Sequence, residues 1–167
     1  MNQFSDKTIS FIGPGEMGSA LVRVMVERKV VQPDKIMVGA RRQEPLDIIK
    51  NENGVRITKD FRQAVEFGDI IILTVSFSGC AGILESIKDL VKDKIFIIVS
   101  VPIDPEKVTR LMTPEHGSAA ETAEKILGED AKVVAAFQNI ATSSLANPSE
   151  LSQRDVLVCG KNKTAKQ

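Results

Sequence analysis

Three glycines, Gly13, Gly15 and Gly18, follow a short apolar segment and open an amphipathic one, in the stretch "ISFIGPGEMGSALVRVM". In a G-x-G-x-x-G turn between a strand and a helix, the first glycine permits the tight turn and the second lets backbone approach a pyrophosphate. The third lets the helix pack closely on the sheet. This spacing predicts a β-α-β unit with a dinucleotide-binding turn; a purely structural turn is the alternative.

Short apolar segments typical of strands alternate with helical patterns along most of the chain. Candidate strands lie at residues 8–13, 35–40, 54–57, 69–75, 94–100, 132–137 and 155–160, and candidate helices at 16–28, 45–53, 60–67, 79–91 and 118–127. Several strands are apolar on consecutive residues, as in a parallel sheet covered by helices. The order predicts the α/β class: a Rossmann-type doubly wound, mainly parallel sheet with helices on both faces.

Composition excludes several function classes. Lys plus Arg and Asp plus Glu both number 22 and the sequence pI is about 6.6, so no nucleic-acid partner is expected. The longest apolar segments are shorter than the roughly 20 residues that span a bilayer, and the N-terminus lacks a signal-peptide pattern. We therefore expect a cytoplasmic protein without a membrane partner. The two cysteines have no CxxC spacing, which favours reduced thiols and no metal site.

The second candidate strand ends in "IMVGARRQEP", where an NAD-preferring site would carry an acidic residue. Arg41 and Arg42 occupy this place. Guanidinium groups hold a 2′-phosphate through charge-assisted hydrogen bonds, whereas a carboxylate would repel it. The pair predicts NADP(H) as cofactor, with Arg41 the stronger candidate and Arg42 stacking on adenine; a solvated arginine pair is the alternative.

No catalytic residue is predicted, because the chain offers no Ser-His-Asp set, metal-ligand cluster or pair of acids in a recognisable motif. His116 stands at a loop-to-helix boundary, where a surface or capping role is expected. Ser118 and Glu121 have the spacing of a capping box. Asp60 and Asp69 stand beside the start of an element and are interpreted as capping or strand-edge residues.

Six segments carry a family resemblance: "IGPGEMGSAL", "VGARR", "DIIILTVSF", "HGSAAETAEKIL", "DAKVVAAFQNIATSSLANPSE" and "DVLVCG". With these, almost the whole chain resembles the NADP-dependent oxidoreductases that use the deazaflavin coenzyme F-420. The segment "FIGPGEMGSALVRVMVERKVVQPDKI" also resembles pyrroline-5-carboxylate reductases.

The resemblance to the deazaflavin-linked family implies roles for particular residues, all at the carboxyl ends of strands. Residues 13–18 would hold the pyrophosphate, 40–42 the 2′-phosphate and 74–77 the nicotinamide side of the cleft. Pro102 belongs to the loop after the fifth strand, and residues 138–141 would face the two ring systems. The expected cofactor-binding residues are Gly13, Pro14, Gly15, Glu16, Met17, Gly18, Ala40, Arg41, Arg42, Thr74, Val75, Ser76, Phe77, Pro102, Gln138 and Asn139.

The chain departs from the family pattern in several places. Ser76 and Phe77 stand where the family tends to have Pro and Trp, and Gln138 and Ala141 where it tends to have His and Pro. Family members continue past "DVLVCG" into another strand and C-terminal helices. We expect an NADP-binding Rossmann domain over residues 1–160 and a polar tail over 161–167, with the family's C-terminal helical part absent from this truncated or diverged member.

The resemblance implies an oxidoreductase that transfers hydride between NADP(H) and F-420, with a deazaflavin or another small hydride acceptor as partner. The alternatives are a non-catalytic NADP-binding module and an imine reductase similar to pyrroline-5-carboxylate reductase. An unfinished sheet edge favours a homodimer, with protection of the edge by the C-terminal tail as the other option.

Overall fold

The computed structural model describes residues 4, 6–104, 106–107, 109–146 and 155–161. Its strands are β1 Ile9–Ile12, β2 Ile36–Gly39, β3 Arg56–Thr58, β4 Ile70–Leu73, β5 Ile95–Ile98, β6 Lys132–Ala136 and β7 Val158–Cys159. Its α-helices are α1 Glu16–Glu27, α2 Gln43–Asn53, α3 Phe61–Phe67, α4 Phe77–Ile87, α5 Ala119–Leu127 and α6 Thr142–Ala146. Two 3-10 turns, η1 Pro33–Lys35 and η2 Lys88–Leu90, complete the described elements.

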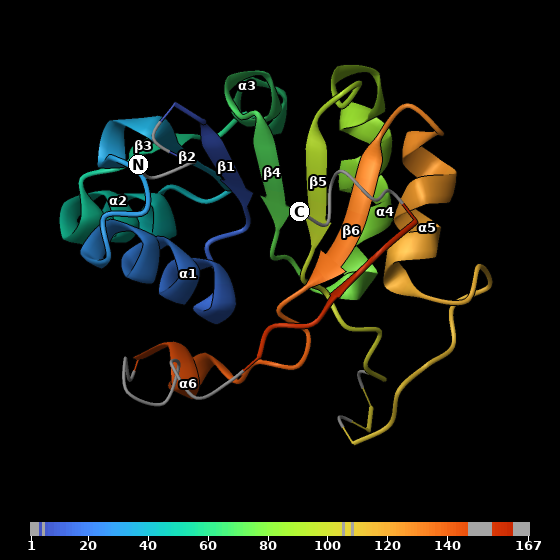
Figure 1. Ribbon diagram of the computed structural model, residues 1–167. Coiled ribbons are helices and arrows are strands. Elements are labelled where there is room, and N and C mark those ends of the chain that lie inside the picture. The colour runs from blue at the N-terminus through green and yellow to red at the C-terminus, as the bar shows by residue number, and fades with distance from the viewer. Residues whose placement is uncertain (1–3, 5, 105, 108, 147–154, 162–167) are drawn as a thin grey trace.

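The strands form one sheet in the order β3-β2-β1-β4-β5-β6-β7 (Figure 1). Every pair from β3 to β6 is parallel, and β7 adds to β6 in the antiparallel direction. The order reverses between β1 and β4, which is where doubly wound sheets bind ligands outside the carboxyl ends of their strands. The predicted fold class is therefore confirmed.

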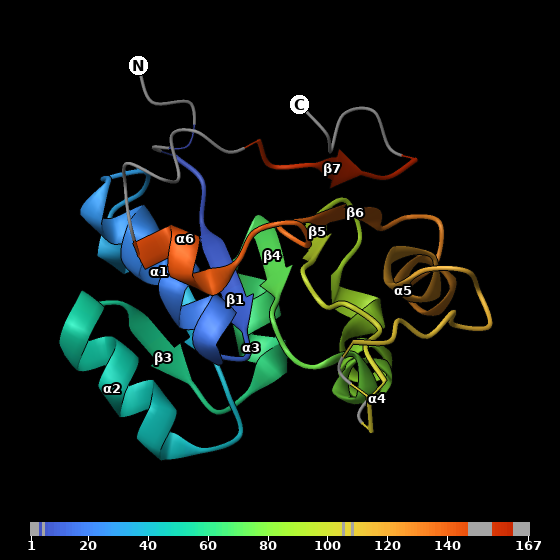
Figure 2. The ribbon, with the colours of Figure 1, turned by 90° about the horizontal axis from the view of Figure 1, so that it is seen from below.

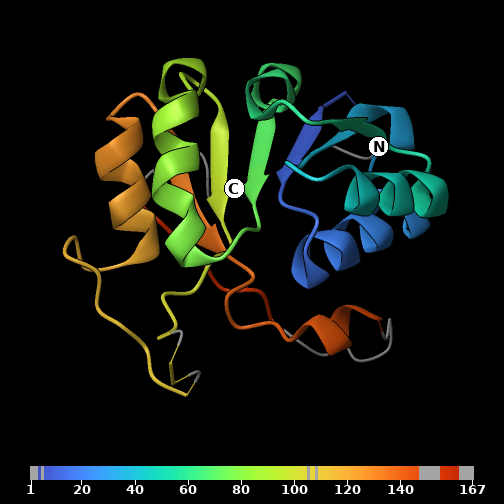
Figure 3. The same ribbon diagram turned by 180° about the vertical axis from the view of Figure 1, so that it is seen from behind.

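Helices cover the sheet in two groups with a core under each. One core joins α1, α2 and α6 to β1 and β2 and includes Phe11, Val38 and Leu46; the other joins α4 and α5 to β4–β6 and includes Leu73, Leu84 and Phe96. Figure 3 shows α4 and α5 lying across the β5–β6 half, and Figure 2 shows α6 beside α1. None of the described helices is long and apolar enough to cross a membrane.

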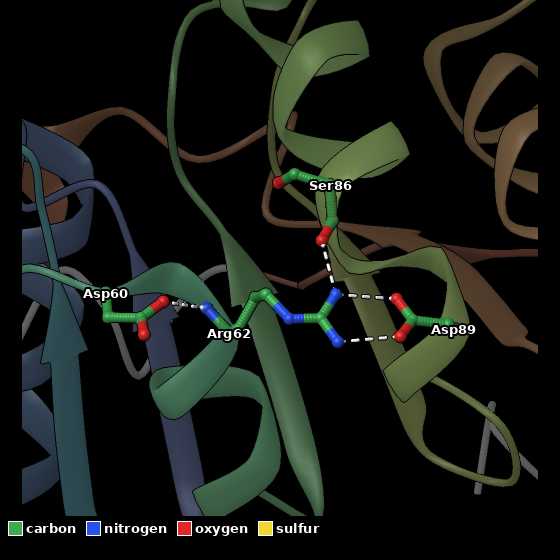
Figure 4. A network of polar contacts seen from close by, with 4 residues as sticks. All are labelled: Asp60, Arg62, Ser86 and Asp89. Atoms are coloured by element: carbon green, nitrogen blue, oxygen red, sulfur yellow. Dashed lines mark hydrogen bonds and ion pairs between the residues drawn. The ribbon is translucent and has the colours of Figure 1, made fainter.

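A polar network joins α3 to the end of α4 on the surface (Figure 4). The Arg62 guanidinium donates two hydrogen bonds to the Asp89 carboxylate, at 2.7 and 2.6 Å, and a third to the carbonyl of Ser86 at 2.8 Å. The hydrogen bond from Arg62 holds the pKa of Asp89 below its ordinary value. The Asp60 carboxylate accepts the backbone N–H of Arg62 at 2.8 Å, so its predicted capping role is confirmed.

The seven predicted strands all form, and the helices differ from expectation mainly at their ends. Helix α2 begins at Gln43, two residues before the predicted start, because a proline is tolerated in the first turn, where N–H groups have no partner within the helix. Helix α4 begins at Phe77 and gives way to η2 after Ile87. The short helix α6 was not predicted, and of the predicted tail only Lys161 lies within the described residues.

Candidate functional site

The glycine turn joins β1 to α1 at the carboxyl edge of the sheet. Gly13 has a φ of +96°, a left-handed conformation that side chains rarely adopt, and its N–H donates to the carbonyl of Gly39 at 3.0 Å. A Cβ atom at this position would lie 2.5 Å from Cγ1 of Val75. Glycine is therefore required both by the backbone conformation and by the neighbouring strand end.

The other two glycines differ in what surrounds them. Gly18 is buried, and an added Cβ would lie 2.5 Å from the Gly13 carbonyl oxygen and 2.6 Å from Oγ1 of Thr74. At Gly15, in contrast, the nearest atom to an added Cβ is the Thr74 carbonyl oxygen at 4.0 Å. The third glycine thus lets the helix pack on the turn, and the second leaves the backbone open to a ligand.

The N-terminus of α1 is not capped by a side chain. Gly15 occupies the N-cap position and offers no side-chain acceptor, so the first N–H groups of the helix remain available to an anion. Glu16 is exposed in the first turn, and the Pro14 carbonyl accepts the Ser19 hydroxyl at 3.3 Å. An uncapped 12-residue helix that starts at a turn with two closely packed glycines, Gly13 and Gly18, and an open one, Gly15, fits a pyrophosphate.

The arginine pair follows β2 at the same edge. Ala40 is buried and its N–H donates to the Thr58 carbonyl at 3.1 Å, whereas Arg41 and Arg42 are exposed. Within the part of the chain that the structure describes, no carboxylate forms an ion pair with either guanidinium. Both cations are thus free to meet a phosphate next to the glycine turn.

Thr74 binds the back of the glycine turn. Its hydroxyl lies 2.5 Å from the Gly13 carbonyl oxygen and 3.2 Å from that of Ile12, to which its N–H also donates at 2.9 Å. The Gly13 carbonyl is thus the nearer acceptor of the hydroxyl. Thr74, the first residue after β4, therefore holds the glycine turn in place. This contact is not evident from the position of Thr74 in the sequence.

A cavity of about 170 Å³ opens beside the turn, at the ends of β4, β5 and β6. It is lined by Met17, Thr74, Val75, Val99, Ser100, Val101, Phe137, Gln138 and Ile140. Four of these residues, Met17, Thr74, Val75 and Gln138, are among the predicted site residues. The lining is largely apolar, as expected for a pocket that receives a flat ring.

The remaining predicted residues of the β4–β6 loops lie outside the lining of this cavity. Ser76 is the N-cap of α4 and Phe77 its first residue, while the Pro102 carbonyl accepts the N–H of Met112 at 2.8 Å. The Asn139 amide donates to the Asp155 carbonyl at 2.8 Å and accepts the Leu157 N–H at 3.2 Å. Asn139 thus holds the segment that leads into β7.

Ile140 lies in the segment 138–141 that the resemblance placed at the rings, but the expected cofactor-binding residues left out four other lining residues: Val99, Ser100, Val101 and Phe137. Phe137 has a φ of +65°, which is rare for a bulky residue and marks a constrained backbone at the end of β6. The available signal was position, since each of these residues comes within a few residues of the end of a predicted strand.

Two larger cavities, of about 630 and 430 Å³, lie along α5 and do not include the glycine turn. Both are lined by Glu121, Glu124 and Lys161, and the Lys161 ammonium pairs with the Glu124 carboxylate at 2.9 Å. Acidic side chains repel phosphate, so size alone does not make this the nucleotide site.

His116 is exposed here, and the Ser118 hydroxyl accepts the Glu121 N–H at 3.1 Å as its predicted cap.

The cysteines are both free thiols, as expected. Cys80 is buried in α4 and Cys159 is exposed on β7. Burial raises the pKa of the Cys80 thiol, which keeps it protonated and unreactive. Among the described residues, no group of three or more His, Cys, Asp or Glu side chains could hold a metal ion.

Fold and turn together define a dinucleotide-binding protein of the doubly wound α/β class. The chain belongs to the family described as "NADP oxidoreductase coenzyme F420-dependent", whose model matches residues 8–102. Membership confirms the resemblance given by the six sequence segments, and with it an oxidoreductase family whose cofactors are NADP(H) and F-420.

The chain is also similar to individual proteins and solved structures. It is 29% identical to the "F420-dependent NADP reductase" of Methanocaldococcus jannaschii, over 93% of this chain and 73% of that protein. A "putative f420 dependent nadp-reductase" from Arthrobacter sp. FB24 has the same fold, with a TM-score of 0.80 at 17% identity over 96% of this chain and 76% of that one. A pyrroline-5-carboxylate reductase structure from Coxiella burnetii matches 82% of this chain and 46% of its own, with 26% identity and a TM-score of 0.67.

Proposed function

We propose that this chain binds NADP(H) across the carboxyl edge of its sheet and supports hydride transfer between NADP(H) and a deazaflavin of the F-420 type. The observation that carries the proposal is the uncapped start of α1 after β1, together with Arg41 and Arg42 after the neighbouring strand β2, whose exposed guanidiniums pair with no carboxylate among the described residues. A pyrophosphate and a 2′-phosphate need these two kinds of donor at adjacent strand ends.

Three groups of described residues would bind three parts of the cofactor. The first N–H groups of α1 would bind the pyrophosphate, with Gly15 allowing close approach. Arg41 would bind the 2′-phosphate, and Arg42 would stack on adenine. The cavity between Val75 and Gln138 would receive the nicotinamide end. NADP(H) itself supplies the hydride, at C4 of the nicotinamide.

Orientation and exclusion of water are the tasks left to the protein in such a reaction. The side chains of Val75, Val99 and Phe137 give the cavity an apolar wall, to which Ile140 adds from the loop after β6. Hydride transfer between two rings requires no general acid or base, which agrees with the absence of a predicted catalytic residue.

The first experiment is calorimetric titration of the chain with NADPH and with NADH, followed by addition of F-420 to the tighter complex. Preference for NADPH and a second heat that requires F-420 would support the proposal, as would an F-420 absorbance change that requires NADPH. NADPH binding without a response to F-420 would favour a non-catalytic NADP-binding module. Absence of nucleotide binding would leave the glycines with a purely structural role.

A second candidate is reduction of a small imine. The likeness to the pyrroline-5-carboxylate reductase of C. burnetii favours it, although the chain spans less than half of that protein. The same NADPH complex can be supplied with pyrroline-5-carboxylate in place of F-420. NADPH oxidation with the imine alone would establish this activity and exclude the deazaflavin as the preferred acceptor.

The oligomeric state and the cellular location also belong to this proposal. β7 is the last strand of the described sheet, and Val158 and the two residues that precede the strand, Val156 and Leu157, expose apolar side chains, which supports a homodimer formed at this edge. Sedimentation of the protein with and without NADPH tests the dimer. A cytoplasmic location is expected of an enzyme that uses the cellular NADP(H) pool, and fractionation tests it.

A further inference from the structure

Ser100 follows β5 and makes three contacts at the carboxyl edge of the sheet. It is 6% exposed, and its hydroxyl donates to the Val75 carbonyl at 2.6 Å. Its own carbonyl accepts the Nε2 of Gln138 at 2.8 Å. The hydroxyl oxygen of Ser100 also lies 3.3 Å from Sγ of Cys80, a residue of α4. One buried serine thereby joins the end of β5 to the ends of β4 and β6.

These bonds continue the contact that Thr74 makes with the glycine turn. A chain of hydrogen bonds crosses the ends of β1, β4, β5 and β6. Thr74 bonds to Gly13, its chain neighbour Val75 bonds to Ser100, and Ser100 bonds to Gln138. Ser100 is the middle link. Two of the three residues that Ser100 contacts, Val75 and Gln138, line the cavity of about 170 Å³ together with Ser100 itself.

We propose that Ser100 is a positioning residue beside the nicotinamide ring: its hydroxyl fixes the Val75 carbonyl, and its own backbone carbonyl holds the Gln138 amide. This inference rests on the proposed NADP(H) site and concerns how its ring end is shaped. The shape of the cavity on its Val75 side, and with it the orientation of the ring, depends on the Ser100 hydroxyl, whereas the bond from Gln138 goes to the Ser100 backbone and remains when the hydroxyl is removed. Nucleotide affinity depends on the phosphate contacts at the start of α1 and at Arg41.

The physical reason is the cost of leaving a half-buried carbonyl without its donor. Without the Ser100 hydroxyl, the Val75 carbonyl must turn toward water or another donor. Val75 also packs against the glycine turn, since its Cγ1 lies 2.5 Å from the position of a Cβ atom added to Gly13. A displacement of about 1 Å at a hydride-transfer site costs up to about 100-fold in rate. The phosphate contacts lie at the ends of β1 and β2 and are not bonded to Ser100.

The test compares Ser100→Ala with Ser86→Ala. Ser86 is the matched control, since its hydroxyl also donates to a backbone carbonyl, that of Ile83 at 2.7 Å, but on the exposed side of α4. For Ser100→Ala we expect a calorimetric Kd for NADPH within about twofold of wild type and loss of the fluorescence gain of bound nicotinamide. The hydride-transfer rate to F-420 should fall about 10- to 100-fold. Ser86→Ala should leave all three quantities unchanged.

Two further variants separate positioning from simple stabilisation. Ser100→Thr keeps the hydroxyl and should restore the nicotinamide fluorescence. Ser100→Cys, measured under reducing conditions, supplies a weaker donor of similar size and should give an intermediate value, and it replaces Ser100→Ala if that variant does not fold. A fluorescence gain and transfer rate equal to wild type in the variant that lacks the hydroxyl would overturn the proposal, and so would a large loss of NADPH affinity.

The outcomes also distinguish this inference from the proposed function. If wild type binds NADPH but does not reduce F-420, the deazaflavin reaction is excluded, and the fluorescence of bound NADPH still decides the role of Ser100. If wild type reduces F-420 and Ser100→Ala behaves like Ser86→Ala, the function stands and the positioning role is wrong. If wild type binds no NADPH, both are overturned.

Discussion

The two edges of the parallel sheet use their polar groups in opposite ways. At the amino edge, side chains satisfy one another and the backbone: the Asp69 carboxylate accepts from the N–H and hydroxyl of Thr8, and the Lys94 ammonium donates to three carbonyls at the end of α3. At the carboxyl edge, α1 starts without a side-chain cap and two arginines lack a carboxylate partner among the described residues.

This difference shows which polar groups contribute to stability and which are available to bind a ligand. Groups at the amino edge already have partners, so they contribute to the free energy of unfolding. The helix N–H groups and guanidiniums at the carboxyl edge gain partners only when a ligand arrives. Substitutions at the amino edge should therefore change stability and leave nucleotide affinity alone, and most substitutions at the carboxyl edge should do the reverse.

Gly18→Ala is expected to have the largest effect and to break this separation. Its Cβ would lie 2.5 Å from a backbone oxygen of the glycine turn, so the turn must move. We expect a loss of about 1–3 kcal/mol in stability from overpacking and a roughly 100-fold weaker Kd for NADPH if the displaced turn costs about 3 kcal/mol of binding. Thermal unfolding and calorimetry measure the two effects.

The control for this substitution is Gly82→Ala in α4. Apart from the neighbouring residues and backbone of its own helix, no described atom lies within 4 Å of an added Cβ there, and alanine favours the helix over glycine by about 1 kcal/mol. This variant should be more stable than wild type, with unchanged NADPH affinity. Equal behaviour of the two alanine variants would show that the close packing at Gly18 is not needed for binding.

Arg41→Ala comes next and affects binding alone. It removes one charge-assisted contact with the 2′-phosphate, worth about 1.5–3 kcal/mol, so the Kd for NADPH should rise about 10- to 100-fold. NADH has no 2′-phosphate, and its Kd should stay nearly constant. Because Arg41 is exposed and has no described ion-pair partner, thermal stability should not change. Equal losses for NADPH and NADH would contradict the assignment.

Lys94→Met tests the amino edge. The ammonium donates at 2.9, 3.2 and 2.6 Å to the carbonyls of Val65, Glu66 and Gly68, while burial lowers the pKa of this lysine. Its removal leaves the end of α3 without these donors, and we expect a loss of about 1–3 kcal/mol in the free energy of unfolding. Urea titration of Lys94→Met against Lys92→Met measures the loss, since Lys92 is exposed. A changed Kd for NADPH would argue against separate edges.

Asp69→Asn should have the smallest effect, and its pH dependence identifies the cause. Hydrogen bonds from Thr8 hold the pKa of Asp69 below its ordinary value, so the folded state binds fewer protons than the unfolded state. The resulting stability is present above the unfolded pKa and is lost as pH falls through the folded pKa. Since solvent screens this exposed group, we expect about 0.5–1 kcal/mol at pH 7.

The difference between wild type and Asp69→Asn should therefore shrink in acid, below about pH 4. Urea titrations of both proteins at pH 7 and at successively lower pH measure it. A difference that stays the same at all of these pH values would show that the lost contact does not depend on the charge of Asp69.

The sequence predicted those parts of the site that depend on backbone conformation and strand order. Gly13 and Gly18 were assigned from spacing alone, and both prove to be positions where a side chain does not fit. Arg41 was assigned because it follows the second predicted strand, where an NAD-preferring site has an acidic residue, and the parallel pairing of β1 with β2 brings the ends of these two strands side by side. Such features are local in the chain or follow from topology.

Side-chain contacts between distant strand ends could not be predicted. The bond from Ser100 to the Val75 carbonyl requires the register of β4 against β5, and the bonds of Asn139 to residues 155 and 157 require the path into β7. Lys94 was part of a predicted strand, but nothing in its sequence neighbourhood shows that α3 ends within its reach. Residue spacing encodes none of these distances.

The order of the strands also has a consequence for synthesis of the chain. β1 is an interior strand, with Ile9 paired to Ile36 of β2 on one side and to Ile70 of β4 on the other. Its first neighbour emerges from the ribosome soon after it, but the second must wait until Leu73 has followed. Until then an apolar strand keeps one open edge, and its closure depends on a contact between segments far apart in sequence, which slows folding and favours protection by a chaperone.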